Sequence, residues 1–190
     1  MNFLTYPARP ISGGDRPRVP TGDWLFSPKM NGWRVLVHVP TRTMWNRHGN
    51  KLTIREEFDE ALDMLTLASP FEWVDCEALE RRHNIGKGSL IILDVVDPNL
   101  TFSERKGLVD EVFPQLEIRN NLIADRNSVY SVPEWEGDPL PKWREMKRIN
   151  EELKCEYLEG LVMKAKDSMY PIQKVSAEDR TWEWVKFRFV

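Results

Sequence analysis

The chain has few of the residues that build disulfide frameworks and zinc sites. Its 190 residues include two cysteines, Cys76 and Cys155, and three histidines. The cysteines lack metal-ligand spacing, and the histidines lie too far apart in the sequence to suggest a zinc site. Unpaired thiols of this kind are typical of reducing compartments. We therefore expect a cytoplasmic protein whose thiols are reduced.

Long apolar runs and an excess of positive charge are also missing. No run approaches the length that crosses a membrane, and the first residues lack the layout of a signal peptide. The formal net charge is −3, which argues against a protein that coats nucleic acid without specificity. A local cationic cleft is still compatible with this charge, because phosphate contacts depend on where the cations lie. We expect no membrane partner.

The residues that are present are typical of one soluble globular domain. Hydrophobic residues make up 41% of the chain and charged residues 30%, and the length is ample for a core. Prolines and glycines recur in residues 1–23, which predicts an extended N-terminal arm lying on the domain. No repeat or low-complexity linker interrupts residues 24–190, so we expect them to form a single domain.

The spacing of apolar residues predicts the helices and strands of this domain. Helices are predicted at 55–67, from an N-cap at Ser103 to Pro114, and from Pro141 to Leu153. Strands are predicted at 24–27, 34–39, 42–45, 71–79, 90–96, 158–164 and 182–189, with shorter candidates near 122–123 and 129–130. The first three strands would form an antiparallel meander. The predicted fold is α+β, with antiparallel sheets flanked by helices.

One lysine stands out because of its surroundings. Lys29 follows a predicted turn at Pro28, and Gly32 would let a ligand or another backbone come close. A lysine at the lip between two strands can act as a nucleophile if it is desolvated or lies beside other cations. Arg34 can supply a bidentate fork for phosphate. Taken alone, this stretch is better explained as a solvated lysine in a hairpin turn, because short motifs of common residues recur by chance.

Three further stretches place charge inside apolar strands. Glu77 and Glu159 need a cation, a metal ion or hydrogen-bond donors. Lys164 follows the second of these acids. Lys186 and Arg188 share one face of the last strand and repel each other unless an anion lies between them. Each could instead belong to a structural ion pair or to a charged edge strand, but together they suggest one cleft.

In order and approximate spacing, these stretches resemble the motifs of covalent nucleotidyltransferases, the superfamily of ATP-dependent DNA ligases, RNA ligases and mRNA capping enzymes. The matching stretches are Lys29–Arg34 (motif I), Asp75–Glu77 (motif III), Leu90–Asp94 (motif IIIa), Glu159–Lys164 (motif IV) and Trp184–Arg188 (motif V). Weaker matches to DNA ligases lie at Asn46–Gly49 and Phe102–Lys106. The resemblance implies the nucleotidyltransferase fold of a ligase adenylation domain.

Three residues and the end of the sequence depart from the family's pattern. Asn31 stands where DNA ligases almost always have Asp, and Cys76 replaces a Gly. Leu93 lies near the position of an aromatic residue that often stacks on adenine. Ligases normally continue after motif V into an OB-fold domain that clamps nucleic acid. We expect no OB-fold domain in this chain, and a partner could supply its clamp.

The resemblance also implies roles for side chains. Lys29 would be the nucleophile that attacks ATP and carries AMP, assisted by Arg34, Lys186 and Arg188. The nucleotide would contact Phe26, Ser27, Pro28, Lys29, Arg34, Glu77, Leu93, Val162, Lys164, Lys186 and Arg188. Glu77 and Glu159 would bind Mg²⁺ or Mn²⁺. Arg34 and Arg47 would contact nucleic acid, although an arginine in a turn such as that of Arg47 is common without function.

The implied activity is that of an ATP-dependent polynucleotide ligase, above all a DNA ligase that seals nicked duplex DNA as a monomer. An RNA ligase and, more weakly, a capping guanylyltransferase are alternatives from the same superfamily. A nucleotide-binding or nick-binding module that needs a partner for adenylation is an alternative from a different class. The complete set of cleft charges favours the enzyme, because buried charge is costly to keep without a use.

Overall fold

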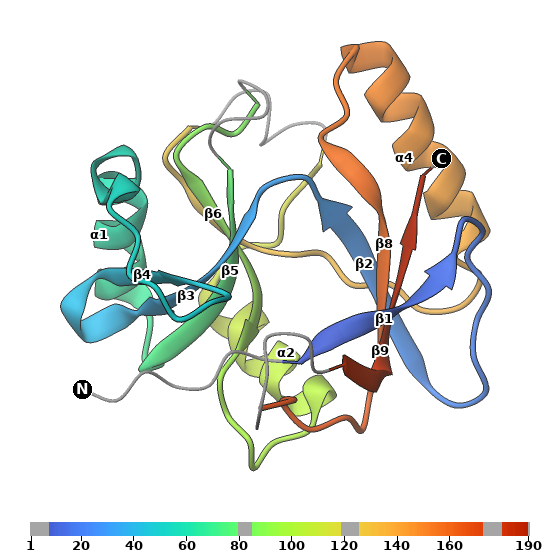
Figure 1. Cartoon of the computed structure of the whole chain (residues 1–190), viewed down its shortest axis with the longest axis horizontal. Helices are drawn as coiled ribbons and strands as arrows, with labels where there is room; N and C mark the ends of the chain where they lie inside the picture. Colours follow the sequence, from blue (N-terminus) through green and yellow to red (C-terminus); the bar gives the residue numbers. More distant parts are fainter. Residues whose placement is uncertain (1–7, 80–84, 119–125, 173–179, 190) are drawn as a thin grey trace.

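The computed structural model describes residues 8–79, 85–118, 126–172 and 180–189. Within them, three α-helices surround two mixed β-sheets (Figure 1). This arrangement confirms the predicted α+β class. No OB-fold domain occurs among the described residues. None of their helices combines the length and apolar character needed to cross a membrane.

The first sheet has four strands in the order β1-β9-β8-β2. They are β1 (Arg9–Gly14), β9 (Arg180–Arg188), β8 (Leu158–Ala165) and β2 (Trp24–Met30). β1 runs parallel to β9, whereas the other two pairings are antiparallel. The part of the predicted arm that forms β1 is therefore a strand of this sheet. Gly13 permits this close packing, since a Cβ there would meet the Phe187 ring at 2.3 Å.

The second sheet has five strands in the order β4-β3-β5-β6-β7. They are β4 (Thr43–Asn46), β3 (Trp33–His38), β5 (Trp73–Leu79), β6 (Ser89–Val95) and β7 (Val129–Ser131). β7 runs parallel to β6, and the other pairings are antiparallel. The prediction of purely antiparallel sheets is thus wrong at one edge pairing in each sheet.

The predicted meander of the first three strands is also wrong. β2 pairs with β8 and β3 pairs with β5, so the chain passes from one sheet to the other between them. The turn falls at Asn31 and Gly32, not at Pro28, which lies inside β2 opposite Leu161. Proline is tolerated there because β2 is an edge strand and needs no further ladder partner.

Three helices cover the outer faces of the sheets, as predicted. They are α1 (Asp59–Ala68), α2 (Phe102–Val112) and α4 (Leu140–Leu153), and short 3-10 turns occur at Val39–Thr41 and Ile54–Phe58. The N-cap of α2 is Thr101, not Ser103, because Thr101 and Glu104 form a reciprocal capping box. The strand candidate near 122–123 lies outside the described residues.

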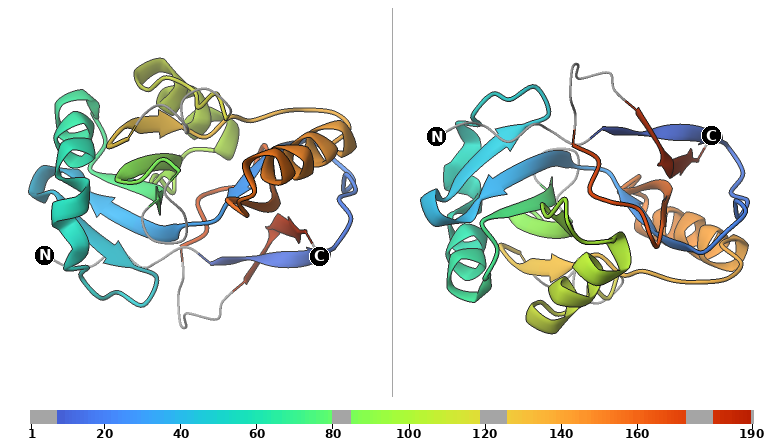
Figure 2. Two further views of the ribbon diagram at one scale, coloured as in Figure 1. Left: turned by 90° about the horizontal axis from the view of Figure 1, so that it is seen from above. Right: turned by 90° about the horizontal axis from the view of Figure 1, so that it is seen from below.

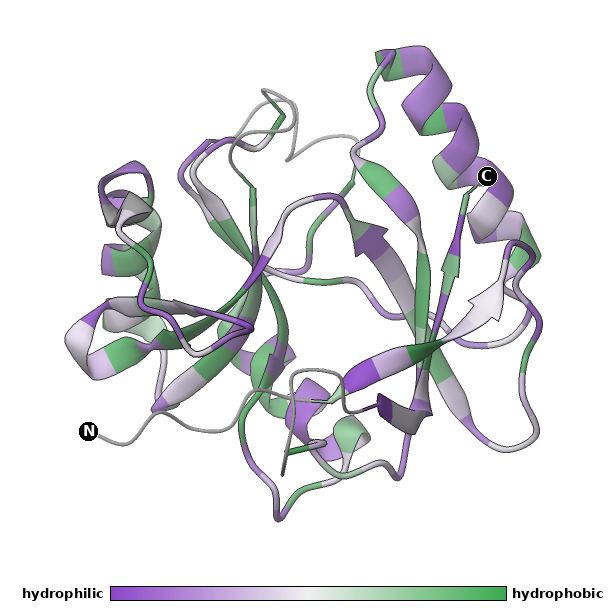
Figure 3. Ribbon diagram, viewed as in Figure 1, coloured by the Kyte–Doolittle hydropathy of each residue, from purple (hydrophilic) through white to green (hydrophobic). Residues whose placement is uncertain are grey.

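Each sheet packs against helices through an apolar cluster, and the first cluster also includes Leu79 and Ile91 of the five-stranded sheet. Met146 and Ile149 of α4 pack with Leu161 and Phe187 of the four-stranded sheet. Leu62 and other apolar residues of α1 and α2 pack against the five-stranded sheet in a second cluster. Figure 2 shows α4 beside one sheet and α1 and α2 beside the other, and Figure 3 shows green, hydrophobic strand centres in both.

Candidate active site

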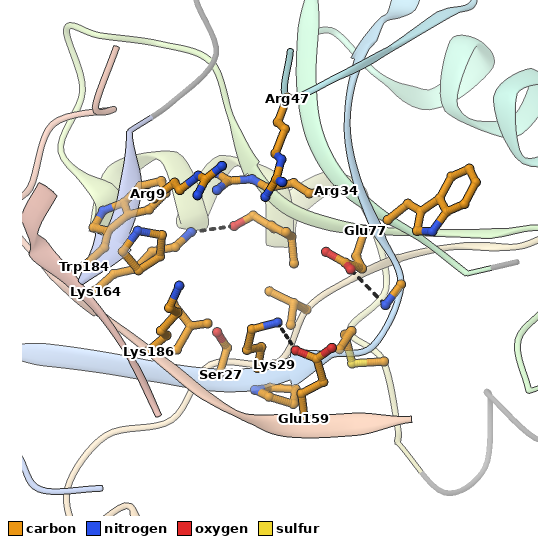
Figure 4. A pocket seen from close by; sticks show the side chains of 18 of the residues that line it. Arg9, Ser27, Lys29, Arg34, Arg47, Glu77, Glu159, Lys164, Trp184 and Lys186 are labelled. Atoms are coloured by element: carbon orange, nitrogen blue, oxygen red, sulfur yellow. Dashed lines mark hydrogen bonds and ion pairs between the residues drawn. The ribbon is translucent and has the colours of Figure 1, made fainter. Parts of the chain in front are cut away.

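A cavity of about 630 Å³ lies between the two sheets (Figure 4). Residues from both sheets line it. Of the predicted site residues, the cavity brings together Ser27, Pro28, Lys29, Arg34, Arg47, Glu77, Leu93, Glu159, Val162, Lys164, Lys186 and Arg188. These positions span most of the sequence and meet only because both sheets contribute to the cavity walls. The predicted single cleft is therefore present.

Phe26 is the exception among the predicted residues. Its side chain is 1% exposed, belongs to the core and packs against Trp135 with ring centroids 5.7 Å apart. It does not line the cavity. Side chains alternate along a strand, so Ser27 and Lys29 face the cavity while Phe26 faces the core. The apolar part of the cavity is formed instead by residues such as Leu93, Val132 and Val162.

Lys29 lies on β2 and forms an ion pair with Glu159 of the neighbouring strand β8. Lys29 lies opposite Gly160, and an irregularity in the register at the next pair, Met30 with Leu158, lets Glu159 reach the same cavity wall. Arg188 of β9 also approaches Glu159, at 3.4 Å. Both members of the Lys29–Glu159 pair keep 20% of their side-chain surface exposed. The amine of Lys29 is therefore within reach of a ligand in the cavity.

Glu77 enters the cavity from β5 on the opposite sheet. Its carboxylate accepts a hydrogen bond of 2.9 Å from the backbone N–H of Gly32. A Cβ at Gly32 would lie 2.9 Å from Cγ of Glu77 and 2.6 Å from a backbone oxygen, so this approach requires glycine. Burial raises the pKa of Glu77 to about 7, although Lys29, the Gly32 N–H and Arg34 pull it down. Glu77 therefore changes charge near neutral pH.

Arg34 on β3 is held by a buried partner. Its guanidinium donates two hydrogen bonds, of 2.9 and 2.5 Å, to Asp75, which is fully buried. The hydroxyl of Tyr170 donates to the same carboxylate at 3.0 Å. Arg34 also lies 5.5 Å from the ring of Trp184. Asp75 thus fixes the orientation of Arg34 at the cavity, a role that the sequence motif alone did not reveal.

Lys164 on β8 is the most deeply buried cation of the cavity wall. Its amine donates to the backbone oxygen of Leu93 at 2.9 Å and to Asp94 at 3.2 Å. Asp94 also accepts two hydrogen bonds from the buried Arg105 of α2. The ring of Trp184 lies 4.4 Å from the Lys164 amine. The network holds this cation beneath the cavity. Of its members, the sequence predicted Lys164 and Leu93 as site residues, and it did not predict Asp94 or Arg105.

Lys186 and Arg188 both face the cavity from β9, as their alternate positions predicted. Burial lowers the pKa of Lys186, and the charges of Arg188 and Lys29 lower it further. Three cations therefore lie close together on one wall, and two of them, Lys29 and Arg188, pair with Glu159. This arrangement suits a ligand that carries more negative charge than one carboxylate.

The part of the cavity lining that sequence reasoning missed includes Arg9, Trp33, His48 and Trp184. Trp184 could have been found, because it is the first residue of the Trp-x-Lys-x-Arg stretch. Arg9 carried no sequence signal, since its place depends on the pairing of β1 with β9. Arg47 lies in the turn after β4, as predicted, and its Nε donates to the ring of His48 at 3.1 Å.

Two of the cavity carboxylates, Glu77 and Glu159, could take part in binding a divalent cation. No group of three or more His, Cys, Asp or Glu side chains with metal-site geometry occurs in the described part of the chain. Mg²⁺ is commonly held by one or two carboxylates together with water and substrate phosphates. Glu77 and Glu159 therefore fit a metal ion that binds together with a phosphorylated substrate. They do not fit a site in which protein side chains supply every ligand.

The fold is similar to that of the nucleotidyltransferase domains of ATP-dependent DNA ligases. No protein-family model and no curated sequence matches the chain. Several solved structures do match the chain. A mycobacterial DNA ligase D complexed with ATP is 16% identical with a TM-score of 0.63, and the match covers 97% of this chain and 60% of that one.

Two further ligases show the same likeness. A Lig E DNA ligase, described as binding DNA with a minimal scaffold, is 12% identical with a TM-score of 0.59, over 95% of this chain and 69% of that one. The Chlorella virus DNA ligase–adenylate is 14% identical with a TM-score of 0.54, over 95% and 67%. At such low identity the likeness is one of fold, and the chain spans only part of each ligase.

Proposed function

We propose that this chain is the nucleotidyltransferase domain of an ATP-dependent polynucleotide ligase that acts on nicked duplex DNA. The observation that carries the proposal is the meeting of Lys29, two carboxylates and the Lys186–Arg188 pair in one cavity. The structures most like it include DNA ligases bound to ATP or carrying an adenylate, and this supports ATP as the substrate of the first step.

In that step, the Lys29 amine attacks the α-phosphorus of ATP. A nitrogen–phosphorus bond forms, the bond from the α-phosphorus to the bridging oxygen breaks, pyrophosphate leaves and the amine loses a proton. Lys29 must part from Glu159 to attack. Lys186 and Arg188 lie on the same wall as Lys29 and would neutralise the charge that develops on the phosphate oxygens. The deeply held Lys164 adds fixed positive charge beneath them.

In the second step, an oxygen of the 5′-phosphate at the break attacks the same phosphorus, and the bond to Lys29 breaks. The amine regains a proton, and AMP is now joined to the nucleic acid. In the third step, the 3′-hydroxyl attacks the 5′-phosphate, loses its proton and expels AMP. Arg34, held by Asp75, and Arg47 come from the opposite sheet and would orient this second phosphate.

Two features complete the proposed substrate site. Leu93, Val132 and Val162 form an apolar slot for the adenine base. Glu77 and Glu159 would hold Mg²⁺ or Mn²⁺, which when bound supplies charge neutralisation at the phosphates. Asn31, where DNA ligases have Asp, donates to the backbone oxygen of Glu156 at 2.7 Å. This hydrogen bond gives Asn31 a structural role in the turn between the two sheets.

The proposal is tested by sealing of a 5′-labelled nicked DNA duplex with ATP and Mg²⁺ or Mn²⁺. We expect sealing by the wild type and by Lys87→Ala, a matched control whose lysine is exposed and outside the cavity. Lys29→Ala is expected to be inactive. Sealing of nicked RNA but not DNA would support the RNA ligase alternative. Tight binding of the nick without any AMP transfer would support a binding module.

A further inference from the structure

A second hollow, of about 560 Å³, lies outside the cavity between the sheets. Residues 15–19 of the loop after β1 and residues 138–140 at the start of α4 line it, together with Gly13. Figures 1 and 2 show this loop, in blue, beside the N-terminal end of α4. The reaction steps proposed above do not use this hollow, which is here called the outer groove.

The outer groove carries charges of both signs. Arg16 and Arg18 are exposed, and neither pairs with a carboxylate in the described part of the chain. Asp15 and Asp138 also line the groove, and Asp138 accepts a hydrogen bond of 3.0 Å from the backbone N–H of Leu140. The two carboxylates balance the two arginines, so the helix beside the groove decides the charge of this surface.

α4 extends the outer groove with a row of cations. Arg144 lies four residues after Leu140, so it continues the side of the helix that lines the groove. Lys147 and Arg148 follow on the same side, and all three cations are exposed. Arg144 and Lys147 have no carboxylate partner among the residues described, whereas Arg148 approaches Glu152 at 3.7 Å. These three cations are here called the α4 stripe.

Positive charge is therefore concentrated on this outer surface. The outer groove and the α4 stripe hold five cations against the two groove carboxylates, and Glu151 and Glu152 follow only at the end of the stripe. The chain as a whole has a net charge of −3. A positive surface on such a chain favours an anionic partner. Arginine and lysine suit phosphate oxygens, and such contacts position a nucleic acid without reading its sequence.

β1 joins the outer groove to the cavity. Arg9 and Pro10 line the cavity, whereas Gly13 on the same strand lines the groove. The strand from Pro10 to Gly13 spans roughly 10 Å, and the helix from Leu140 to Arg148 rises roughly 12 Å. Each length is well below one turn of duplex DNA, about 34 Å. A duplex with its break at the cavity is therefore long enough to reach the groove and the stripe.

On the basis of the proposed function, we propose that the outer groove and the α4 stripe bind backbone phosphates of the duplex DNA that flanks the break. Arg16, Arg18 and Arg144 would make the main contacts, because no carboxylate of the described residues pairs with them. These contacts lie outside the cavity. They would therefore raise the affinity for a long duplex and leave the loading of AMP unchanged.

The first test measures how DNA binding depends on salt. The variant Arg16→Gln/Arg144→Gln removes one cation from the groove and one from the stripe. The control Lys87→Gln/Arg126→Gln removes two exposed cations that line neither hollow. Each lost phosphate contact lowers the slope of log affinity against log salt by about 0.9, so we expect a fall of about 1.8 in the variant and affinity roughly tenfold lower at about 0.2 M salt. The control should match the wild type.

The second test varies the length of DNA beside the break. Nicked duplexes with arms of about 4 or about 18 base pairs are closed by uncharged linkers, and the shorter arm extends only about 14 Å. We expect the wild type to bind the long arms more tightly and Arg16→Gln/Arg144→Gln to lose most of that gain. Arg16→Lys/Arg144→Lys keeps both charges and should bind within about threefold of the wild type. Loading of AMP from ATP should be equal in all variants.

Three results would contradict this inference. An unchanged salt slope and arm-length gain in Arg16→Gln/Arg144→Gln would exclude DNA from this surface and favour an acidic protein as its partner. An equal loss in the control would show an effect of net charge alone. A lysine variant as weak as the glutamine variant would show that charge is not what binds. Each result, in a wild type that loads AMP and binds nicked DNA, leaves the proposed function intact. A wild type that does neither contradicts the proposed function instead.

Discussion

The two walls of the cavity hold their charged side chains in different ways. On the four-stranded wall, Lys29 and Glu159 are one-fifth exposed and the side chain of Arg188 is 60% exposed. On the five-stranded wall, Arg34 is locked by the fully buried Asp75, which Tyr170 also holds. Apart from the buried Lys164, which Leu93 and Asp94 hold, the charged side chains of the first wall can therefore exchange partners during a reaction. On the second wall, Asp75 fixes the geometry of Arg34. Substitutions on the two walls should fail in different ways.

The largest effect is expected from Asp75→Ala on the fixed wall. The change leaves the guanidinium of Arg34 without its bidentate partner in a buried setting, which costs about 3–5 kcal/mol of the free energy of unfolding. Urea denaturation measures this loss. The control is Asp97→Ala, whose carboxylate only accepts from the backbone of Asn99 at the surface. Equal stability of the two variants would contradict the difference between the walls.

On the exchangeable wall, Lys186→Ala should fold normally but load AMP about 10²-fold more slowly, as expected for loss of a cation at developing phosphate charge. Removal of this lysine also relieves its repulsion by Arg188 and Lys29. The melting temperature should therefore stay at or above that of the wild type. Single-turnover loading and thermal melting are the two measurements. A clear loss of stability would show that Lys186 has a structural role.

Glu134 provides a prediction at the link between the walls. It follows β7 and precedes Trp135, which pairs with Phe26 of β2. Neither carboxylate oxygen has a hydrogen-bond partner within the described residues. The pKa of Glu134 is raised to about 8, mainly by burial. The positive charges of Lys164 and Lys106 lower this pKa, and the negative charges of Asp94 and Asp110 raise it.

Because the folded state holds this proton more tightly, the stability contributed by Glu134 is complete below about pH 4.5 and is lost as pH rises through about 8. Glu134→Gln carries no such loss. It should stabilise the protein by about 2–3 kcal/mol at pH 7 and by little at pH 4.5. Urea denaturation at the two pH values measures the difference. An equal effect at both would show that the carboxyl group is ionised in the folded protein.

The smallest effect is expected from the titration of Glu77. With a pKa of about 7, its carboxylate forms as pH rises from 6 to 8, and loading of AMP should rise about tenfold if the ionised form is the active one. Glu77→Gln should load slowly and lose this step in the pH profile. A profile that is the same in wild type and variant would remove Glu77 from the reaction.

The side chains that line the cavity were more predictable from sequence than the strand pairing that forms it. The resemblance to ligase motifs pointed to Lys29, beside a predicted turn, and to Glu77, Glu159 and Lys186, which are charges inside apolar strands. It could not show that β2 and β3 belong to different sheets, since local patterns do not specify which strands pair. Nor could it find Arg9, whose approach depends on the long-range pairing of β1 with β9.

Errors about the direction of side chains also arise because local sequence does not specify long-range packing. Phe26 was expected in the base slot because it lies near Lys29 in sequence, yet its side chain faces the core. Asp94 and Arg105 support Lys164 from another strand and from a helix. Such support depends on packing between elements far apart in the chain, which no short motif records.

The most direct test is the intact mass of the protein before and after incubation with ATP and Mg²⁺ or Mn²⁺. We predict a gain of one adenylyl group in the wild type and in Lys87→Ala, and none in Lys29→Ala or Lys29→Arg. A wild type that gains nothing, and carries no adenylate beforehand, would contradict the proposed activity of this chain. A gain that persists in the Lys29 variants would contradict Lys29 as the nucleophile.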